Sequence, residues 1–324
     1  MQVAIIEKTG DSKVIKFKEI DDPSKFKKDD VLIKQTAIGI NFFDICFRRG
    51  QYKINEMPAI IGAEACGIVE AVGSNVKEFK VGDRVAYCTG AIGSYCEKRV
   101  IDKRFLIYIP QDISDTIAVA SLKKGMMAHT LLNRVFRAKL VKSILVHSAA
   151  GGVGQFLCQF AKSMGIDVIG TVGSSNKVDS ALRNGCRAVI DRSKDENFSK
   201  ELSKLTDGVG VGVVYDGIGK STIVNSLSCL WPMGLCVSYG ESSGAADNLN
   251  LNYLVANSLF ITRPTLALYK SSRVELVVGA SEVFDGISKG ILKPTYTEYA
   301  FKDIAQAHKD LESGKTIGSL VVKI

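Results

Sequence analysis

The stretch SILVHSAAGGVGQFLCQFAK, residues 143–162, decides the fold. A short apolar run at 144–146 leads into a glycine-rich turn, after which apolar residues recur with helical spacing. This strand–turn–helix order is the setting in which a dinucleotide fingerprint binds pyrophosphate, because the first backbone N–H groups of the helix attract an anion. Ala149 stands where the first glycine is expected, so the motif reads A-x-G-x-x-G. A glycine-rich turn that binds no ligand is the alternative.

The glycines of this turn have separate expected roles. Gly151 lets the backbone approach a pyrophosphate closely, and Gly154 lets the helix pack tightly against the strand. We expect the pyrophosphate to be held by Ala150, Gly151, Gly152, Val153 and Gly154.

The residues after the second predicted strand, 166–172, indicate which dinucleotide binds. An acid about twenty residues beyond the glycines usually binds the ribose 2′-hydroxyl of NAD. The sequence has no acid there and reads GSSNK at 173–177. Small hydroxyl donors followed by a cation suit a 2′-phosphate, so we expect NADP(H), with Gly173, Ser174 and Lys177 as contacts. In the alternative, Ser174 only caps a helix and Lys177 is solvated.

Length and composition limit the class of protein. The chain has 324 residues, 46% hydrophobic and 23% charged, which is typical of a globular protein with two domains. Its start lacks the pattern of a signal peptide, and no apolar run approaches the roughly twenty residues that cross a bilayer. We therefore expect a cytoplasmic protein without a membrane partner. Eight cysteines occur singly, without a C-x-x-C pair, and are expected to be reduced, mostly buried thiols.

The net charge of +8 does not indicate a nucleic-acid partner. Basic residues alternate with acids along most of the chain, and no basic block contains interleaved aromatic residues. A solvated, lysine-rich surface is the simpler interpretation.

The pattern of predicted elements changes near residue 123. Before it, short β-rich runs alternate with turn residues, which predicts a small irregular barrel with strands at 2–7, 14–20, 30–38, 67–72, 84–88 and 95–101. After it, apolar runs alternate with helical patterns, which predicts a doubly wound parallel sheet with strands at 143–147, 166–172, 188–190, 211–215, 234–239 and 258–262. The tail adds helices at 274–288 and 303–312 and a strand at 319–324.

The chain resembles the medium-chain dehydrogenase/reductase superfamily in this order of elements. The runs AIGINFFD, YDGIG, SYGESSG and TRP are similar to its zinc-free quinone oxidoreductase (zeta-crystallin-like) branch. The branch signature is met from Leu145 through Gln159 and Lys162, except for its polar lead-in. The resemblance implies an α/β fold in which a GroES-like β-rich catalytic domain (1–122 and 263–324) accompanies a Rossmann domain (123–262) that binds NADP(H).

Two positions bear on a metal. A zinc alcohol dehydrogenase of this superfamily would offer a cysteine near Ile40 and a histidine after Gly62, where this sequence has Asn41 and Ala63. Neither side chain replaces a thiolate or imidazole, so no metal is expected. Hydride transfer from a nicotinamide to an electron-poor quinone needs little Lewis-acid help. Alternatives are an NADPH-dependent 2-alkenal or enone reductase, and a non-catalytic crystallin-like or RNA-binding protein.

The resemblance also implies the site residues. Asn41 is expected to donate a hydrogen bond near the nicotinamide and the acceptor. Tyr52 is expected to stack on the acceptor or to hydrogen-bond it, and Arg263 to bind the cofactor or an anionic acceptor edge. Their structural alternatives are a turn-forming Asn, ordinary loop packing and an ion pair. Cys46 and Arg192 stand where bacterial relatives tend to have Tyr, so Arg192 is expected to contact the adenosine ionically. The remaining expected cofactor contacts are Gly125, Met127, Gly217, Tyr239, Ser242 and Thr265.

The last predicted Rossmann strand, SLFIT at 258–262, is apolar and contains no proline or lysine. An open sheet edge of this kind pairs readily with another chain. We therefore expect a homodimer that joins the two sheets about a two-fold axis, as the resemblance also implies.

Overall fold

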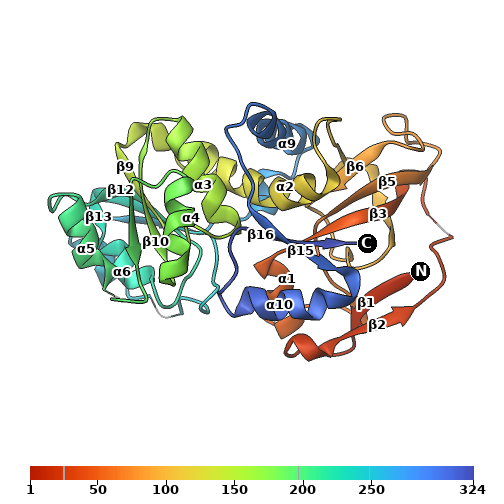
Figure 1. Cartoon of the computed structure of the whole chain (residues 1–324), viewed down its shortest axis with the longest axis horizontal. Helices are drawn as coiled ribbons and strands as arrows, with labels where there is room; N and C mark the ends of the chain where they lie inside the picture. Colours follow the sequence, from red (N-terminus) through yellow and green to blue (C-terminus); the bar gives the residue numbers. More distant parts are fainter. Residues whose placement is uncertain (25, 196, 248) are drawn as a thin grey trace. The chain divides into compact units, whose positions relative to one another are not determined.

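The computed structural model describes residues 1–24, 26–195, 197–247 and 249–324 (Figure 1). The chain forms two compact units. The first contains Met1–Lys123, Lys270–Ser288 and Pro294–Ile324, and the second Lys124–Tyr269 and Lys289–Lys293. Residues 263–269 thus belong to the second unit, whereas the sequence analysis assigns them to the first domain. The domain boundaries expected from the sequence, after residues 122 and 262, stay predictions.

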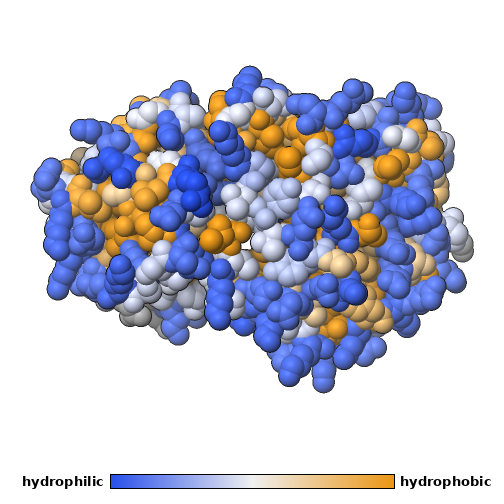
Figure 2. Space-filling view, in the orientation of Figure 1, coloured by the Kyte–Doolittle hydropathy of each residue, from blue (hydrophilic) through white to orange (hydrophobic). Residues whose placement is uncertain are grey.

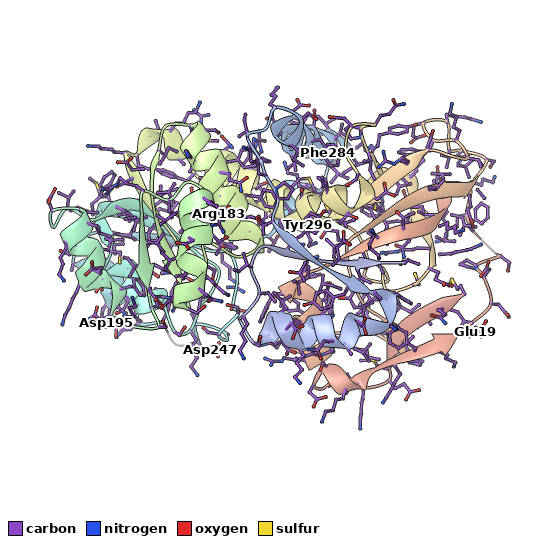
Figure 3. All side chains as sticks on the ribbon, viewed as in Figure 1. Glu19, Arg183, Asp195, Asp247, Phe284 and Tyr296 are labelled. Carbon is purple, nitrogen blue, oxygen red and sulfur yellow. The ribbon has the colours of Figure 1, made fainter. Side chains whose placement is uncertain are left out.

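The first unit is rich in β-structure. Its elements are β1 (Gln2–Ile6), β2 (Ile15–Glu19), β3 (Asp30–Ile40), α1 (Phe42–Arg49), β4 (Ala59–Ile60), β5 (Ala65–Val72), β6 (Arg84–Tyr87), β7 (Lys98–Asp102), β8 (Ile107–Tyr108), α9 (Arg273–Ser288), β15 (Tyr296–Ala300), α10 (Ile304–Glu312) and β16 (Ser319–Lys323). A three-stranded sheet has the order β2-β1-β4, and a larger sheet the order β15-β16-β3-β5-β6-β8, with β7 also paired to β3. Figure 3 labels Phe284, which is buried on α9, and Tyr296, which begins β15.

Strand β3 positions the candidate site of this unit. It pairs antiparallel with β5, β7 and β16, and its residues Val31, Ile33, Ile38 and Ile40 are fully buried. The chain leaves β3 at Ile40 and enters α1 at once, so the residue between the two elements is held by a packed strand on one side and a helix on the other.

The second unit is a doubly wound parallel sheet, as predicted. Its elements are β9 (Ser143–Val146), α3 (Gly152–Ser163), β10 (Asp167–Val172), α4 (Val178–Arg183), β11 (Ala188–Asp191), α5 (Phe198–Leu205), β12 (Val211–Asp216), α6 (Ile223–Leu227), β13 (Leu230–Ser238), α7 (Asn252–Val255), β14 (Phe260–Thr262) and α8 (Leu266–Tyr269). Helix α2 (Asp115–Thr130) contains the boundary between the units. The six strands are parallel in the order β11-β10-β9-β12-β13-β14.

This strand order indicates where a ligand would bind. The order reverses between β9 and β12, and ligands of open parallel sheets bind at the carboxyl ends of the strands beside such a switch point. A buried apolar cluster that includes Leu145, Ile169 and Val214 holds the strands together. The turns that follow the six strands therefore meet along one edge of the sheet.

The face of the chain that Figure 2 shows is mostly polar. Hydrophilic side chains cover much of the face in Figure 2, with hydrophobic residues gathered in separate patches. Among the described residues, no helix is long and apolar enough to cross a membrane. All eight cysteines are buried, free thiols, as predicted.

Candidate active site

The turn after β9 has the shape of a phosphate-binding loop. Ser148 has a φ of 52°, so the left-handed residue of the turn is Ser148 and Ala149 keeps an ordinary backbone. This explains why alanine is tolerated where a glycine is expected. The Gly151 N–H donates to the Ser148 carbonyl at 2.8 Å, and Gly151 is the N-cap of α3.

The glycines of the turn leave no space for side chains. A Cβ on Gly154 would lie 2.0 Å from the Ser148 carbonyl oxygen, and one on Gly151 would lie 3.1 Å from it. The first turn of α3 carries no acid, so its N-terminal N–H groups and dipole can receive an anion. The residues present therefore fit the pyrophosphate of a dinucleotide.

The segment after β10 adds a cation. Ser174 precedes a short 3₁₀ turn, Ser175–Lys177, and its hydroxyl donates to the Asn176 side chain at 2.6 Å rather than capping a helix. Lys177 is half-buried, and burial lowers the pKa of its ammonium group. A Cβ on Gly173 would meet nothing within 4 Å, so open space adjoins this segment.

The end of β11 lies beside this segment, because Val172 and Asp191 are register partners. The Ser175 hydroxyl donates to the Asp191 carboxylate. Arg192 follows and donates its backbone N–H to the Val172 carbonyl at 2.9 Å. Two cationic residues, Lys177 and Arg192, thus come from adjacent strand ends, where a 2′-phosphate would need them.

The next strand ends carry further predicted cofactor contacts. A Cβ on Gly217 would lie 2.7 Å from the Tyr239 ring, and the Ser242 N–H donates to the Gly217 carbonyl at 3.3 Å. The other predicted contacts of this unit are Gly125 and Met127, buried in α2, and Thr265, exposed just before α8. The cofactor roles of all these residues stay predictions.

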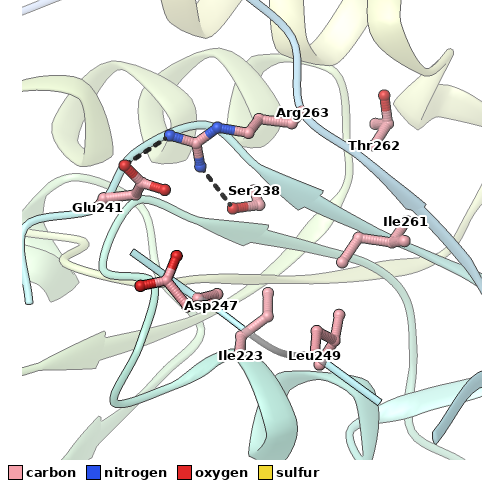
Figure 4. A pocket seen from close by; sticks show the side chains of 9 residues that line it. Ile223, Ser238, Glu241, Asp247, Leu249, Ile261, Thr262 and Arg263 are labelled. Atoms are coloured by element: carbon pink, nitrogen blue, oxygen red, sulfur yellow. Dashed lines mark hydrogen bonds and ion pairs between the residues drawn. The ribbon is translucent and has the colours of Figure 1, made fainter. Parts of the chain in front are cut away.

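Arg263 follows β14 and forms an ion pair in this structure. Its Nη2 lies 2.9 Å from the Glu241 carboxylate, and its Nη1 donates to the Ser238 hydroxyl at 3.4 Å (Figure 4). A cavity of about 300 Å³ adjoins the pair and is lined by Asp247 and by apolar residues such as Ile223 and Ile261. The contact agrees with the structural alternative for Arg263.

His147 is a buried core residue. Its Nδ1 lies 2.8 Å from the Thr171 hydroxyl and its Nε2 2.9 Å from the Ser226 hydroxyl, which donates to Asp216 at 2.8 Å. Burial lowers the pKa of His147 to about 4, so the ring is neutral at neutral pH. The Asp216 carboxylate also accepts the N–H groups of Ile218 and Gly219, and this network fixes the turn that carries Gly217.

Asn41 lies in the first unit, between β3 and α1. It is buried and is the N-cap of α1, and its backbone N–H donates to the Asp44 carboxylate at 2.9 Å. Its Nδ2 donates to Glu64 Oε2 at 2.9 Å and to the Gly39 carbonyl at 3.2 Å. Both amide hydrogens thus have protein acceptors, so the predicted donor role requires the amide to exchange one of these partners for the acceptor.

Glu64 is the residue that sequence reasoning undervalued. The sequence analysis does not name it among the site residues, whereas the structure places its fully buried carboxylate against the Asn41 amide. No sequence signal links two residues that are 23 positions apart on different elements. Glu64 therefore orients Asn41.

Tyr52 follows α1 and forms an aromatic cluster with Phe43 and Phe47 of that helix. Its ring centroid lies 5.4 Å from that of Phe43 and 5.5 Å from that of Phe47. Phe43 remains 39% exposed, so the cluster presents a ring at the surface of the unit. Cys46, on the same helix, is buried.

In the described part of the chain, no group of three or more His, Cys, Asp or Glu side chains is arranged to hold a metal ion. Neither Asn41 nor Ala63 is a ligand for zinc, and the absence of a metal from the protein stays a prediction.

Comparison with known proteins identifies the family. A model of the alcohol dehydrogenase GroES-like domain matches residues 27–111, and one named zinc-binding dehydrogenase matches residues 152–276. A quinone oxidoreductase of Pseudomonas aeruginosa is 39% identical over 97% of this chain and 96% of its own length. The chain belongs to the quinone oxidoreductase family of medium-chain dehydrogenases/reductases. Its two units accordingly correspond to the GroES-like and Rossmann-type folds.

Two further relatives inform the chemistry. In the crystal structure of the Escherichia coli quinone oxidoreductase complexed with NADPH, the protein is 38% identical in sequence to this chain. The two structures superpose over the full length of both chains with a TM-score of 0.96. A 2-haloacrylate reductase of a Burkholderia species is 39% identical and covers 90% of each chain.

Proposed function

We propose that the protein is an NADPH-dependent quinone oxidoreductase. The observation that carries this proposal is the complete phosphate turn of α3, followed by Lys177 in place of an acid, in a chain that matches quinone oxidoreductases along nearly its whole length. The relative whose structure contains NADPH supports the choice of cofactor.

Some residues of the chain would bind the cofactor, and others would orient the groups that contact the acceptor. The turn at 150–154 holds the pyrophosphate, and Lys177 and Arg192 receive the 2′-phosphate. The bound nicotinamide supplies a hydride, which an electron-poor conjugated ring accepts without a Lewis acid. Glu64 holds Asn41 in place, and the aromatic cluster with Tyr52 offers an apolar surface to the acceptor.

Reduction of an α,β-unsaturated carbonyl compound is the second candidate. The 2-haloacrylate reductase is as similar in sequence as the quinone oxidoreductase of Pseudomonas aeruginosa, each at 39% identity. A screen of NADPH oxidation with quinones and 2-alkenals side by side decides between the two. We expect higher kcat/KM values for quinones, and higher values for alkenals would reverse the assignment.

We also propose that catalysis is independent of zinc. The side chains of Asn41 and Ala63 offer no zinc ligand, so the purified protein should contain no stoichiometric zinc, and chelators should leave its activity intact. Elemental analysis before and after dialysis against a chelator measures both. One zinc per chain, lost together with activity, would refute this.

A homodimer through β14 is a further part of the proposal. Strand β14 is the edge strand of the six-stranded sheet, and Phe260 on it is 60% exposed. Phe260→Lys should weaken the dimer by placing a charge at the pairing edge, while the cofactor turn stays formed. Val209→Lys is the matched control, because Val209 is an exposed apolar residue of the same unit outside the sheet. Light scattering at micromolar concentration measures the result, and a monomeric unmodified protein, or a Phe260→Lys variant that stays dimeric, contradicts this interface.

We further propose that the enzyme acts in the cytoplasm, without a membrane or nucleic-acid partner. The interleaved charges of its surface support this. The non-catalytic alternative, an RNA-binding protein, predicts RNA affinity that falls steeply with salt. RNA binding without NADPH oxidation would favour that alternative.

A further inference from the structure

Lys123 and Asn41 both donate hydrogen bonds to the carboxylate of Glu64. The Lys123 backbone N–H donates to Glu64 Oε1 at 2.8 Å, and Glu64 Oε2 accepts the Asn41 amide hydrogen bond at 2.9 Å. One buried carboxylate thus fixes both residues. The Lys123 side chain is half-buried and contacts Cys88 and Phe43.

The Lys123 ammonium group is held by neutral partners. Its Nζ donates to the Cys88 carbonyl at 2.7 Å and lies 5.2 Å from the centroid of the Phe43 ring. Among the described residues, Lys123 forms no ion pair. An ammonium group has three N–H donors, so two remain after the bond to Cys88. The position of the Lys123 ammonium group is therefore fixed by Cys88 and Phe43, while no carboxylate of the described residues pairs with its charge.

A second polar group lies close along the chain. Thr89 follows Cys88, is 9% exposed, and has a hydroxyl that finds no hydrogen-bond partner in the described part of the structure. Buried hydroxyl groups normally have partners, so one that lacks a partner indicates a place where a ligand or water binds.

The Phe43 ring that contacts Lys123 belongs to the aromatic cluster of α1. Phe43 stacks edge-on with Phe47 at 4.9 Å between centroids and contacts Tyr52 at 5.4 Å. A conjugated molecule bound against this cluster beside Asn41 would lie near the cation that is held over the Phe43 ring. Such a cation favours an anionic substituent through charge-assisted hydrogen bonds.

We propose that Lys123 is a specificity-determining residue that selects acceptors with an anionic substituent, a carboxylate or a sulfonate, on the conjugated system. The inference rests on the proposed function. Lys123 gives up no proton in this role: the acceptor gains a hydride from the cofactor and a proton from solvent, and the ammonium group pairs with the substituent throughout.

The test compares two acceptors that differ in charge, 1,2-naphthoquinone-4-sulfonate and 1,2-naphthoquinone. The measured quantity is the ratio of their kcat/KM values with NADPH. Lys123→Met should lower the sulfonate-to-neutral ratio by roughly ten- to a hundredfold, the effect of one charge-assisted hydrogen bond. Lys123→Arg keeps the charge and should retain most of the ratio.

Lys16→Met is the matched control. Lys16 is exposed on β2, and its removal changes the net charge by the same amount, so it reports long-range attraction alone. The ratio should be unchanged in Lys16→Met. Equal ratios in Lys123→Met and the unmodified protein, or an equal loss in Lys16→Met, would overturn the proposal. If the unmodified protein reduced neither quinone, the proposed function itself would fail and this inference with it.

Discussion

Replacement of Gly154 by alanine is expected to abolish NADPH binding. The new Cβ would lie 2.0 Å from the Ser148 carbonyl oxygen, a backbone atom that cannot rotate away. The start of α3 must therefore move away from β9. Its N–H groups then no longer point toward the pyrophosphate. We expect an affinity loss of at least about a hundredfold, which corresponds to roughly 3 kcal/mol. Titration of the protein with NADPH by fluorescence measures the dissociation constant.

A substitution at a second glycine distinguishes this effect from a general loss of stability caused by an added methyl group. Gly173→Ala adds the same methyl group where nothing lies within 4 Å, so the melting temperature of the protein without cofactor should be unchanged. Gly154→Ala should lower that melting temperature and also lose the stabilisation that added NADPH gives. An alanine variant at 154 that binds NADPH within about threefold of the unmodified protein would contradict the assigned turn.

The second large effect is expected at Lys177. Removal of its ammonium group in Lys177→Ala should cost about 1.5 to 3 kcal/mol of NADPH binding, because a charge-assisted bond to the 2′-phosphate is lost. NADH lacks this phosphate, so the ratio of kcat/KM values for NADPH and NADH should fall roughly ten- to a hundredfold.

The control for Lys177 is another lysine of the same unit. Lys204 on α5 is exposed and forms an ion pair with Glu201 at 3.2 Å, so Lys204→Ala should leave the cofactor ratio unchanged. A Lys177→Ala variant that keeps the full preference for NADPH would show that other groups, Arg192 first among them, bind the phosphate.

The Rossmann sheet could be predicted well from the sequence. Parallel strands are buried on both faces, so they are continuous apolar runs, and all six predicted strands appear as β9–β14. The bounds of helix α2 could not be predicted, because residues such as Ala118, Leu122 and Met126 are fully buried and the helix shows no apolar face opposite a polar one. Strand β15 was missed because its side chains are largely exposed and follow no alternation.

The pairings within the candidate site could not be predicted. Glu241 follows β13 and Arg263 follows β14, so the sheet order makes them neighbours, but sequence spacing alone does not. The same holds for Asn41 and Glu64, which β3 and β5 bring together. Motifs indicate the turn that binds a ligand, whereas the partners that orient its residues depend on tertiary packing.

The most direct test of the account is the cofactor preference of the unmodified protein. Steady-state oxidation of NADPH and NADH should be measured with the same quinone, with and without a chelator. We expect kcat/KM for NADPH to exceed that for NADH by at least about tenfold, since a charge-assisted bond contributes about 1.5 kcal/mol or more, and the chelator to have no effect. Equal kcat/KM values for the two cofactors would contradict the account.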